Sequence, residues 1–461
     1  MYISVNEQNT TKLERILISE LGNHIGDTVR VRGRVHTVRN QGKIIFIILR
    51  DRSGKEQAVV WSGNGEDLFN KAKTLTSESV IDITGIVKEA KQVKSGHELE
   101  VKELSIDSVS RVPLPIVIEQ PYSHNISNLD RRLDYRWIDL RSERNNLMMK
   151  VATVMGDGLR GYCIENNFVE IQGPRIISAA SESGANVFEV KYFDRKAYLA
   201  QSPQFHKQMG IAADLERVFN MGPVFRAEKS FTTRHLTEYT SFDVEIGYID
   251  SFRDVCKFEQ EMIKFTLNKV KEKYGEDIKR VFNVDINIPE GDFPYVSMKE
   301  AKEKLASANI PSKDVGDFSP EEERALSEII EKETGSQFVF VYDYPHSRRA
   351  FYHMKNSDRP EIALGFDLFW KGIEITTGAQ REHRLENLKE NATERGLTEE
   401  SLKEYFEYFE YGCPPHGGFA LGTERFLMKL LEYNSILETT YLPNTPNRLG
   451  KLINVDKKKI K

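Results

Sequence analysis

The sequence predicts an α+β protein with two domains, a small N-terminal β-barrel and a larger domain that mixes helices and strands. Its 461 residues are about three times the ~150 residues of an average domain. Short strand patterns occupy residues 28–107, a proline-rich stretch follows at 108–127, and helix and strand patterns alternate after it. We therefore expect a barrel domain within 1–107, a linker at 108–127 and a second domain at 128–461.

Composition narrows the class of protein before any motif is considered. Hydrophobic residues make up 39% and charged residues 29% of the chain, with 65 Lys and Arg against 70 Asp and Glu, which is ordinary for a globular protein. The longest apolar run, Ile44 to Leu49, is far shorter than the roughly 18 residues of a membrane span. Cys163, Cys256 and Cys413 are too far apart for a disulfide scaffold or a CxxC metal site. No basic and apolar signal begins the chain, so we expect a cytoplasmic protein without a membrane partner.

Five short strands are expected in the first domain, at 28–35, 44–49, 56–61, 80–87 and 99–106. In the first of them valines alternate with Arg30, Arg32 and Arg34, so the arginines project from one face. Between Thr28 and Val60 there are eight Lys and Arg against two acids. A five-stranded barrel with a basic face is typical of the oligonucleotide-binding (OB) fold. The alternative is that these arginines merely solvate an outer sheet face.

Helical patterns open the second domain. Residues 129–146 are rich in helix formers and charges, residues 147–166 have helical periodicity, and a strand is expected at 168–171 before Gly173-Pro174. No GxxxxGK[ST] loop and no GxGxxG motif after a strand occurs, so a nucleotide would have to bind without these loops.

The segment 222–239 contains the first group of residues suited to chemistry. Arg226 and Glu228 are two apart, so on a strand they would share a face, and the polar stretch 229–233 would be the loop of a long hairpin. A guanidinium group matches phosphate oxygens, and a neighbouring carboxylate can accept from an amino group. The alternative is a surface ion pair.

The segment 366–381 contains the second group. Lys371-Gly372 is suited to a two-residue hairpin turn, which would make Phe369 and Glu374 cross-strand partners and place Asp367 on the same face as Glu374. Two acids on one face repel each other unless a cation lies between them, and such oxygen ligands suit Mg²⁺ that also contacts phosphates. The alternative is that both acids are exposed to solvent.

The segment 417–425 contains the third group. It predicts a glycine-bracketed strand that leads directly into a helix capped by Thr423, with Arg425 in the first turn. A helix N-terminus with an arginine suits an anion. Simple packing of a strand on a helix would explain the glycines but not Arg425.

In this order, the motifs resemble those of the class II aminoacyl-tRNA synthetases, and most closely the aspartyl-tRNA synthetases of archaeal and eukaryotic type. The first class motif would end at Pro174, the second lies at Phe225–Glu228 and the third at Gly422–Arg425. Three further stretches match: RLDYRWIDLR at 132–141, QSPQFHKQ at 201–208 and GAQREH at 378–383. The resemblance covers almost the whole chain, and the ordered set is far more specific than any single motif.

The resemblance implies an anticodon-binding OB barrel followed by a six-stranded antiparallel catalytic sheet flanked by helices, with an insertion around 300–345 between the second and third motifs. It implies that aspartate reacts with ATP to form aspartyl-adenylate and is then transferred to the 3′ end of tRNA-Asp. The carboxylate of the substrate itself attacks the α-phosphorus, so alignment and charge stabilisation would carry catalysis without a general base. Mg²⁺ bound with ATP and a homodimer formed through the first motif are also implied.

The resemblance assigns a role to individual residues. Arg226 would bind the α-phosphate and Arg425 the γ-phosphate, and these two are the candidate catalytic residues. The implied ATP-binding residues are Arg226, Glu228, Arg234, His235, Tyr239, Glu374 and Arg425. The implied aspartate-binding residues are Ser181, Glu182, Gln204, Lys207, Asp243, Thr377, Arg381 and His383. The implied Mg²⁺ ligands are Asp367, Glu374 and Thr377.

Lys207 and Arg381 match the two cations that hold the side-chain carboxylate of the substrate. Fixed cations favour a carboxylate, whereas an amide would leave their donors unmatched, so the pair would discriminate aspartate from asparagine. The nearest alternative is an asparaginyl-tRNA synthetase, which shares the three class motifs. A non-catalytic tRNA-binding paralogue is the second alternative. It predicts loss of the phosphate- and metal-binding side chains, all of which are present.

In the barrel, Phe46, Gln57 and Glu100 match the anticodon contacts of the family. An aromatic ring would stack on an unpaired base and two polar side chains would bind base edges. Glu98 is the alternative to Glu100, and a place in the core is the alternative for Phe46. His36 lies where a Trp accompanies strict discrimination in archaeal-type relatives and a His accompanies relaxed use. This residue therefore predicts that tRNA-Asn is charged in addition to tRNA-Asp.

Overall fold

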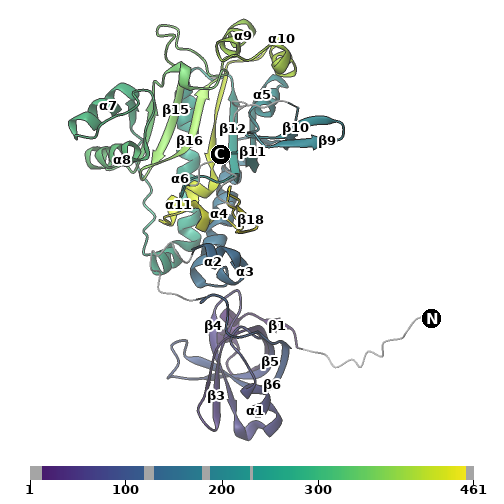
Figure 1. Cartoon of the computed structure of the whole chain (residues 1–461). Helices are drawn as coiled ribbons and strands as arrows, with labels where there is room; N and C mark the ends of the chain where they lie inside the picture. Colours follow the sequence, from purple (N-terminus) through teal and green to yellow (C-terminus); the bar gives the residue numbers. More distant parts are fainter. Residues whose placement is uncertain (1–12, 119–128, 179–186, 229–231, 453–461) are drawn as a thin grey trace. The chain divides into compact units, whose positions relative to one another are not determined.

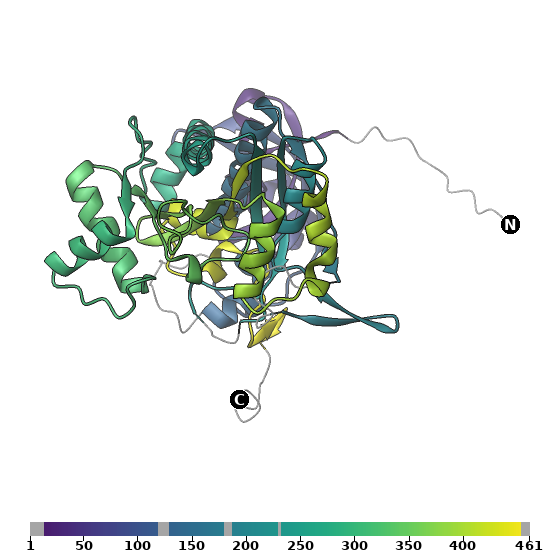
Figure 2. The ribbon, with the colours of Figure 1, turned by 90° about the horizontal axis from the view of Figure 1, so that it is seen from above.

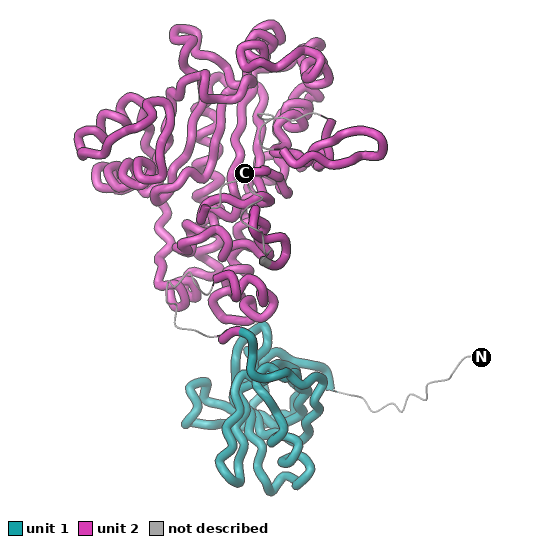
Figure 3. Tube along the Cα trace, in the orientation of Figure 1, with its two compact units in different colours: residues 1–115 teal, residues 116–461 magenta. Residues whose placement is uncertain are grey.

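The computed structural model describes residues 13–118, 129–178, 187–228 and 232–452. It divides into two compact units, residues 1–115 and 116–461 (Figure 3). The division falls inside the stretch 108–127 that the sequence predicts as a linker. Within the described ranges, no helix is long and apolar enough to cross a membrane.

Unit 1 is a barrel whose strands follow the order β1-β2-β3-β4-β6-β5, with β5 also paired to β2. The second pairing closes the barrel, which confirms the predicted OB fold. Strands β3 and β4 bury every second residue, as the apolar alternation predicts. The elements of this unit are β1 (Arg15–Ile16), η1 (Ile18–His24), β2 (Thr28–Asn40), β3 (Ile44–Arg50), β4 (Lys55–Trp61), η2 (Ser62–Asn64), α1 (Glu66–Lys73), β5 (Val80–Glu89) and β6 (His97–Ser108).

Unit 2 is built on an eight-stranded sheet (Figure 1). Its six central strands are antiparallel, and the two outermost strands, β13 and β7, pair in parallel with their neighbours. In sheet order the strands are β13 (Tyr295–Ser297), β14 (Phe338–Tyr342), β15 (Gly365–Trp370), β16 (Ile373–Gln380), β17 (His416–Gly422), β12 (Glu238–Gly247), β11 (Arg217–Phe225) and β7 (Val169–Glu170). The six-stranded antiparallel core agrees with the architecture that the resemblance implies.

One face of this sheet is covered by the long helices α4 (Glu143–Glu165) and α6 (Phe252–Phe282), which form the main core together with α11 (Thr423–Leu430). Strand alternation decides which side chains face them. On β12, Phe242 and Val244 belong to this core, so Asp243 and Glu245 must point to the opposite face. The opposite face is therefore the polar one, and the functional residues gather there.

The helix pair α7 (Met298–Ser307) and α8 (Pro320–Thr334) packs on the polar face at one edge of the sheet. Its apolar side chains form a separate cluster with Val339 and Val341 of β14 and Phe369 of β15. In Figure 2 this green pair lies at one side of unit 2, and the teal hairpin β9–β10 projects at the other. The pair occupies most of the stretch 300–345 that the sequence predicts as an insertion.

Shorter elements complete unit 2. The helices are α2 (Leu129–Asp134), α3 (Arg136–Asp139), α5 (Gln204–Ala212), η4 (His346–Arg348), α9 (Leu385–Glu394), η5 (Glu400–Leu402), α10 (Lys403–Glu410) and α12 (Ile436–Thr439). The strands are β8 (Ile176–Ile177), β9 (Glu189–Tyr192), β10 (Arg195–Leu199), β18 (Arg448–Leu449) and β19 (Lys451–Leu452).

Two local predictions are wrong. The strand β11 ends at Phe225, so Arg226 and Glu228 lie in the connection after it and not on the strand, although Arg226 N still donates to Thr237 O (2.9 Å). Thr423 is the first residue of α11 and not its cap: Gly422 holds the cap position, and the Thr423 hydroxyl donates to Thr240 O instead (3.0 Å). The hydroxyl is thus used to join the helix to β12.

Candidate active site and nucleic-acid face

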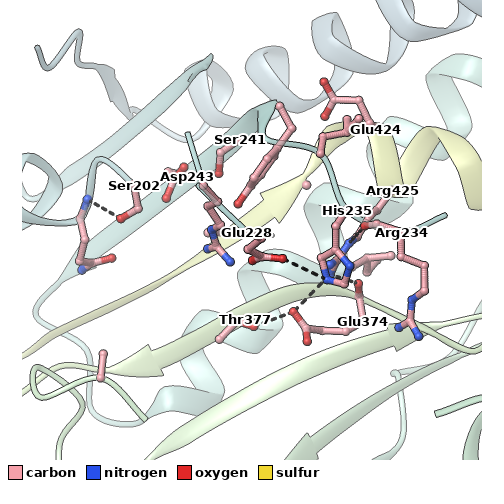
Figure 4. A pocket seen from close by; sticks show the side chains of 18 of the residues that line it. Ser202, Glu228, Arg234, His235, Ser241, Asp243, Glu374, Thr377, Glu424 and Arg425 are labelled. Carbon is pink, nitrogen blue, oxygen red and sulfur yellow. Dashed lines mark hydrogen bonds and ion pairs between the residues drawn. The ribbon is translucent and has the colours of Figure 1, made fainter. Parts of the chain in front are cut away.

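A cavity of about 470 Å³ opens on the polar face of the sheet in unit 2 (Figure 4). Most of the residues singled out in the sequence line it, from strands β12 and β16, from helices α5 and α11, and from the connections around them. These lining residues are Gln204, Arg226, Glu228, Arg234, His235, Tyr239, Asp243, Glu374, Thr377, Arg381 and Arg425. Lys207, Asp367 and His383 do not line it, and Ser181 and Glu182 lie outside the described residues.

Three arginines converge on one end of the cavity. Arg425, in the first turn of α11, donates from Nη1 to Glu374 O (3.0 Å) and from Nε to Arg234 O (3.3 Å), so it links β16 to the connection before β12. The Arg226 guanidinium lies 5.7 Å from the centre of the Tyr239 ring. Three guanidinium groups at one end of a cavity favour an anion with several oxygens, such as a polyphosphate, although Arg234 pairs with Glu323 and Arg425 lies 3.6 Å from Glu374 Oε1.

His235 and Glu228 point toward each other at this end (Figure 4), with 4.0 Å between Nε2 and Oε2. Burial lowers the pKa of His235, and the positive charge of Arg425 lowers it further. At neutral pH the imidazole is therefore predominantly uncharged, and it accepts or donates hydrogen bonds without adding to the positive charge of the arginines.

The hairpin β15–β16 has the predicted register. Lys371 and Gly372 form its turn with φ angles of 47° and 76°, and Phe369 pairs with Glu374. The sequence does not predict a β-bulge in this hairpin. The register shifts between Leu368 and Phe369, which leaves Ile375 as an extra residue in β16. Such a bulge changes which residues share a face of the sheet.

Because of this bulge, Thr377 lies on the same face as Glu374, and its Oγ1 donates to Glu374 Oε1 (3.0 Å). Asp367 pairs with Thr377 in the register, so all three predicted metal ligands share one face. Burial raises the pKa of Glu374, and the negative charge of Asp367 raises it further. Asp367 is buried, so the alternative of two solvent-exposed acids is wrong for this residue.

Sequence reasoning missed Arg349. It donates from Nη1 and Nη2 to the two carboxylate oxygens of Asp367 (3.0 and 2.7 Å) and stacks on the Tyr344 ring, 3.6 Å from its centre. Arg349 itself lines the cavity. Nothing in its local sequence marks it, because its partner is 18 residues away and meets it only in the folded chain.

The side chains present fit a divalent cation that is shared with a phosphate. The described part of the chain contains no group of three or more His, Cys, Asp and Glu that could enclose a metal ion. Mg²⁺, however, is commonly held by one or two carboxylates, with substrate phosphates and water completing its shell. Such an ion would relieve the repulsion between Asp367 and Glu374 that Arg349 and Arg425 leave uncompensated.

The other end of the cavity is formed by a buried network of alternating charges. Lys207 Nζ lies 3.1 Å from Asp243 Oδ1 and 3.3 Å from Glu245 Oε2, and Arg381 Nε donates to Glu245 Oε1 (2.9 Å). Lys207 and Glu245 are wholly buried beneath the cavity, whereas Asp243 and Arg381 line it. Burial alone would raise the pKa of Glu245, but the charges of Arg381 and Lys207 hold it below its usual value. The Glu245 carboxyl therefore stays ionised at neutral pH.

Two groups of this network have unused bonding capacity toward the cavity. Asp243 Oδ1 is paired with Lys207 Nζ, whereas Asp243 Oδ2 has no hydrogen-bond partner among the described residues. Arg381 uses Nε and Nη2 for Glu245 and for Gly418 O (2.9 Å), and no described residue accepts from its Nη1. One end of the cavity thus offers an acceptor for an ammonium group beside a donor for a carboxylate.

The remaining predicted residues lie around this end. Gln204 lines the cavity and donates from Nε2 to Gln208 Oε1 (3.1 Å). His383 is half-buried outside the lining, and burial lowers its pKa. Its Nδ1 has no hydrogen-bond partner in the described ranges.

A second residue missed in the sequence is Glu323 of α8. Its carboxylate pairs with Nη2 of Arg234, so it ties the α7–α8 helix pair to the arginine end of the cavity. Burial raises the pKa of Glu323 to about 7, although the charge of Arg234 opposes this. The two residues are 89 positions apart in the sequence, and no local pattern links them.

In unit 1, the predicted nucleic-acid contacts lie on the outer face of β3, β4 and β6. Phe46 pairs with Val59 and is half-buried on this face, outside the core. Gln57 Nε2 donates to Glu98 Oε2 (2.8 Å). Glu100 pairs with Lys102 and Lys88, and these hydrogen bonds lower its pKa to about 2. The two candidate acids therefore have different partners: Glu98 bonds to Gln57, and Glu100 pairs with two lysines.

The positive charge predicted for β2 is largely paired. Arg30 bonds to Asp82 of β5 (2.6 Å), and Arg32 bonds to Asp107 of β6 (2.6 Å). His36 lies at a bulge of the same strand, with its Nδ1 3.4 Å from Arg50 Nη1. Arg30 and Arg32 thus link β2 to β5 and β6 and supply little net charge to a ligand.

Comparison with known proteins agrees with this geometry. A family described as tRNA synthetases class II (D, K and N) matches residues 128–446, and one described as OB-fold nucleic acid binding domain matches residues 29–107. The aspartate–tRNA(Asp/Asn) ligase of Aeropyrum pernix is 39% identical over 92% of this chain and 96% of its own length. The aspartate–tRNA(Asp) ligase of Pyrococcus abyssi is 37% identical with the same coverage. Among solved structures, the asparaginyl-tRNA synthetase of Pyrococcus horikoshii, complexed with asparaginyl-adenylate, superposes with a TM-score of 0.85 at 31% identity and covers 95% of this chain and 100% of its own.

Proposed function

Because the chain belongs to the class II tRNA synthetases of the D, K and N type, we propose that it is an aspartate–tRNA ligase. It activates L-aspartate with ATP to form aspartyl-adenylate and transfers the aspartyl group to the 3′ end of tRNA-Asp. The observation that carries this proposal is a single cavity with an arginine cluster at one end and the pair Asp243–Arg381 at the other. Relatives named as aspartate–tRNA ligases match over 92% of the chain.

In the first step the α-carboxylate of aspartate attacks the α-phosphorus of ATP, and diphosphate leaves. Arg226 binds the α-phosphate and Arg425 binds the γ-phosphate, and their charges stabilise the additional negative charge of the transition state. Glu228 and Tyr239 hold the adenine, and Arg234 and His235 contact the phosphates. No side chain has to remove a proton, because the attacking carboxylate is already ionised, so the rate depends on alignment.

Mg²⁺ would be held by Asp367, Glu374 and Thr377 together with phosphate oxygens, and it would neutralise part of the charge of ATP. Arg349 keeps the Asp367 carboxylate in a fixed orientation. Thr377 does the same for Glu374 through its hydroxyl hydrogen bond. Both acids are thus oriented by the protein itself.

Selection of aspartate depends on the buried network. Arg381 donates to the side-chain carboxylate of the substrate, and Asp243 accepts from its ammonium group, with Gln204, Ser181, Glu182, Thr377 and His383 completing the site. Lys207 acts from beneath: its charge balances Asp243 and Glu245, which lets Arg381 direct its remaining donors toward the ligand. An amide in place of the carboxylate would leave a guanidinium N–H without an acceptor, which disfavours asparagine.

The test is ATP–diphosphate exchange with each of the two amino acids. We expect exchange with aspartate and at least about 100-fold less with asparagine, since a lost charged hydrogen bond in a closed site costs about 3 kcal/mol. Arg381→Gln should abolish this preference. Exchange that depends on asparagine would assign the chain to the asparaginyl alternative. No exchange with either amino acid would favour the second alternative, a non-catalytic tRNA-binding protein.

We also propose that tRNA-Asn is charged with aspartate. His36 supports this, since a His at this position accompanies relaxed use in archaeal-type relatives. Charging of the two purified tRNAs tests it, and His36→Trp should reduce charging of tRNA-Asn more than that of tRNA-Asp. Absence of aspartyl-tRNA-Asn with the wild-type chain would contradict it.

Two further expectations belong to this proposal, a homodimer and a cytoplasmic location. Apolar side chains of α4, β7 and β8 that are exposed in the single chain support the dimer: Ile164, Val169 and Ile176 are between 44% and 58% exposed. Light scattering during size-exclusion chromatography should give twice the 53.1 kDa mass of one chain. The location is measured by fractionation of cells.

A further inference from the structure

Trp61, the last residue of β4, is 52% exposed although its side chain is large and mostly apolar. It pairs with Ile44 in the register, and the neighbouring pair on the same face joins Val59 to Phe46. Since side chains alternate along a strand, Trp61 and Phe46 project from the same outer face, diagonally across two strands. Positions related in this way are about 7–8 Å apart, so two large rings there form one aromatic surface.

The Trp61 ring has a fixed support. A Cβ atom built at Gly63 would overlap three carbons of the six-membered Trp61 ring, Cε3, Cζ3 and Cη2. The ring therefore lies directly against the backbone of η2, and this is possible because residue 63 has no side chain. An aromatic ring supported in this way loses little side-chain entropy when a second planar group stacks on it.

The charges around this surface suit a polyanion. Arg39 pairs with Phe46 across β2 and β3, and Lys43 immediately precedes β3. Both are exposed, and neither forms an ion pair with any residue that the structure describes, in contrast to Arg30 and Arg32 at the other end of β2. Unpaired cations beside exposed aromatic rings are the combination that binds single-stranded nucleic acid: the cations track the backbone, and the bases stack on the rings.

We propose that Trp61 is a second stacking platform of the barrel and that it holds an unpaired base of the tRNA next to the base held by Phe46. Arg39 and Lys43 bind the phosphates that flank these bases. This inference rests on the proposed function, because it takes tRNA as the partner, and it adds a contact on a residue outside the predicted anticodon set.

The first experiment measures the Kd for tRNA-Asp and the rate of ATP–diphosphate exchange, which needs no tRNA. Loss of one stacked base weakens binding about 5-fold to 100-fold, so Trp61→Ala should raise the Kd by this factor and leave exchange unchanged. Trp61→Phe keeps a ring and should retain most of the affinity. Gly63→Ala keeps Trp61 but displaces its ring, so its Kd should lie between those of the wild type and Trp61→Ala.

Trp137→Ala is the matched control, since Trp137 is 55% exposed in the other unit, and its Kd should stay within about 2-fold of wild type.

The second experiment uses tryptophan fluorescence. The chain has three tryptophans, and Trp370 is buried at 2% exposure. In a Trp137→Phe background, Trp61 is therefore the tryptophan that acrylamide can reach. Bound tRNA-Asp should quench its emission and protect it from acrylamide.

A Kd for Trp61→Ala within about 2-fold of wild type, or acrylamide quenching that bound tRNA leaves unchanged, would overturn the proposal while aspartate-dependent exchange and charging persist. Failure of the proposed function has a different signature. In that case the wild-type chain would show no exchange with aspartate, whatever residue 61 is.

Discussion

Exposed ion pairs on the outer face of the barrel and the ion pairs beneath the cavity of unit 2 hold their charged side chains in different environments. On the outer face of the barrel, pairs such as Arg32–Asp107 remain partly exposed, at 46% and 31% of their side chains. Beneath the cavity of unit 2, Lys207 and Glu245 are wholly buried. Water and salt screen the first kind of pair but hardly reach the second. Salt and water therefore weaken the exposed pairs of the barrel face, whereas the buried pairs keep their strength.

The largest expected effect follows from breaking the buried network. Lys207→Met removes the cation between Asp243 and Glu245 and leaves buried carboxylates without their partner, which should lower the free energy of unfolding by about 3–5 kcal/mol. Urea denaturation followed by circular dichroism measures this. Lys196→Met is the matched control, because Lys196 forms an exposed pair with Glu189, and it should cost less than about 1 kcal/mol. Equal losses in both variants would contradict the difference between buried and exposed pairs.

The second effect depends on pH. Burial raises the pKa of Glu259 on α6 to about 8, and Thr376 Oγ1 donates to its Oε1. The folded state thus binds this proton more tightly than the unfolded state, whose carboxyl pKa is about 4.5. The stability that this group contributes is complete below that value and is lost as pH rises through about 8, a loss of up to about 5 kcal/mol.

Glu259→Gln resembles the protonated side chain and removes this dependence. Its free energy of unfolding should lie within about 1 kcal/mol of that of the wild type near pH 5 and exceed it at pH 9 by about 5 kcal/mol. Denaturation curves at the two pH values measure the difference. A wild-type stability that rises between pH 5 and pH 9 relative to the variant would have the wrong sign and contradict a buried, protonated Glu259.

The third effect tests the tie between the α7–α8 pair and the cavity. Glu323→Gln weakens the hold on Arg234, so we expect the KM for ATP to rise about 3-fold to 10-fold, the cost of roughly 1 kcal/mol for a partly buried pair. The KM for aspartate and kcat should change little, because the aspartate end lies elsewhere in the cavity. Glu321→Gln, an exposed acid in the same helical turn, should change neither. Parallel increases in both KM values would point to a general distortion.

Whether a feature depends on local or on distant residues explains what the sequence predicts and what it does not. Alternation in β3 and β4 predicts the barrel, because an exposed strand face leaves a period of two in the chain. The Lys371-Gly372 turn predicts the pairing of Phe369 with Glu374 for the same local reason. Both features depend on residues a few positions apart.

Features that depend on distant residues could not be predicted. Arg349 and Glu323 act on partners 18 and 89 positions away, and the burial of Lys207 beneath the cavity follows from how α5 packs on the sheet. The bulge at Ile375 is a further case, since its sequence differs in no obvious way from a regular strand. The class motifs identify which residues are functional, but their partners are visible only in the fold.

The smallest effect on stability is expected on the barrel face, where it separates the two candidate base readers. The pKa of Glu100 is lowered to about 2 by hydrogen bonds to Lys102 and Lys88, so the stability it contributes is present above the usual carboxyl pKa and is lost as pH falls toward 2. Solvent screens these exposed pairs, and Glu100→Gln should cost less than about 1 kcal/mol at pH 7.

A larger loss in tRNA charging therefore reports a lost contact with the tRNA and not a loss of stability. We expect kcat/KM for tRNA-Asp to fall about 10-fold in Glu100→Gln, the cost of one lost base contact, and less in Glu98→Gln. The reverse order would assign base reading to Glu98, which already bonds to Gln57.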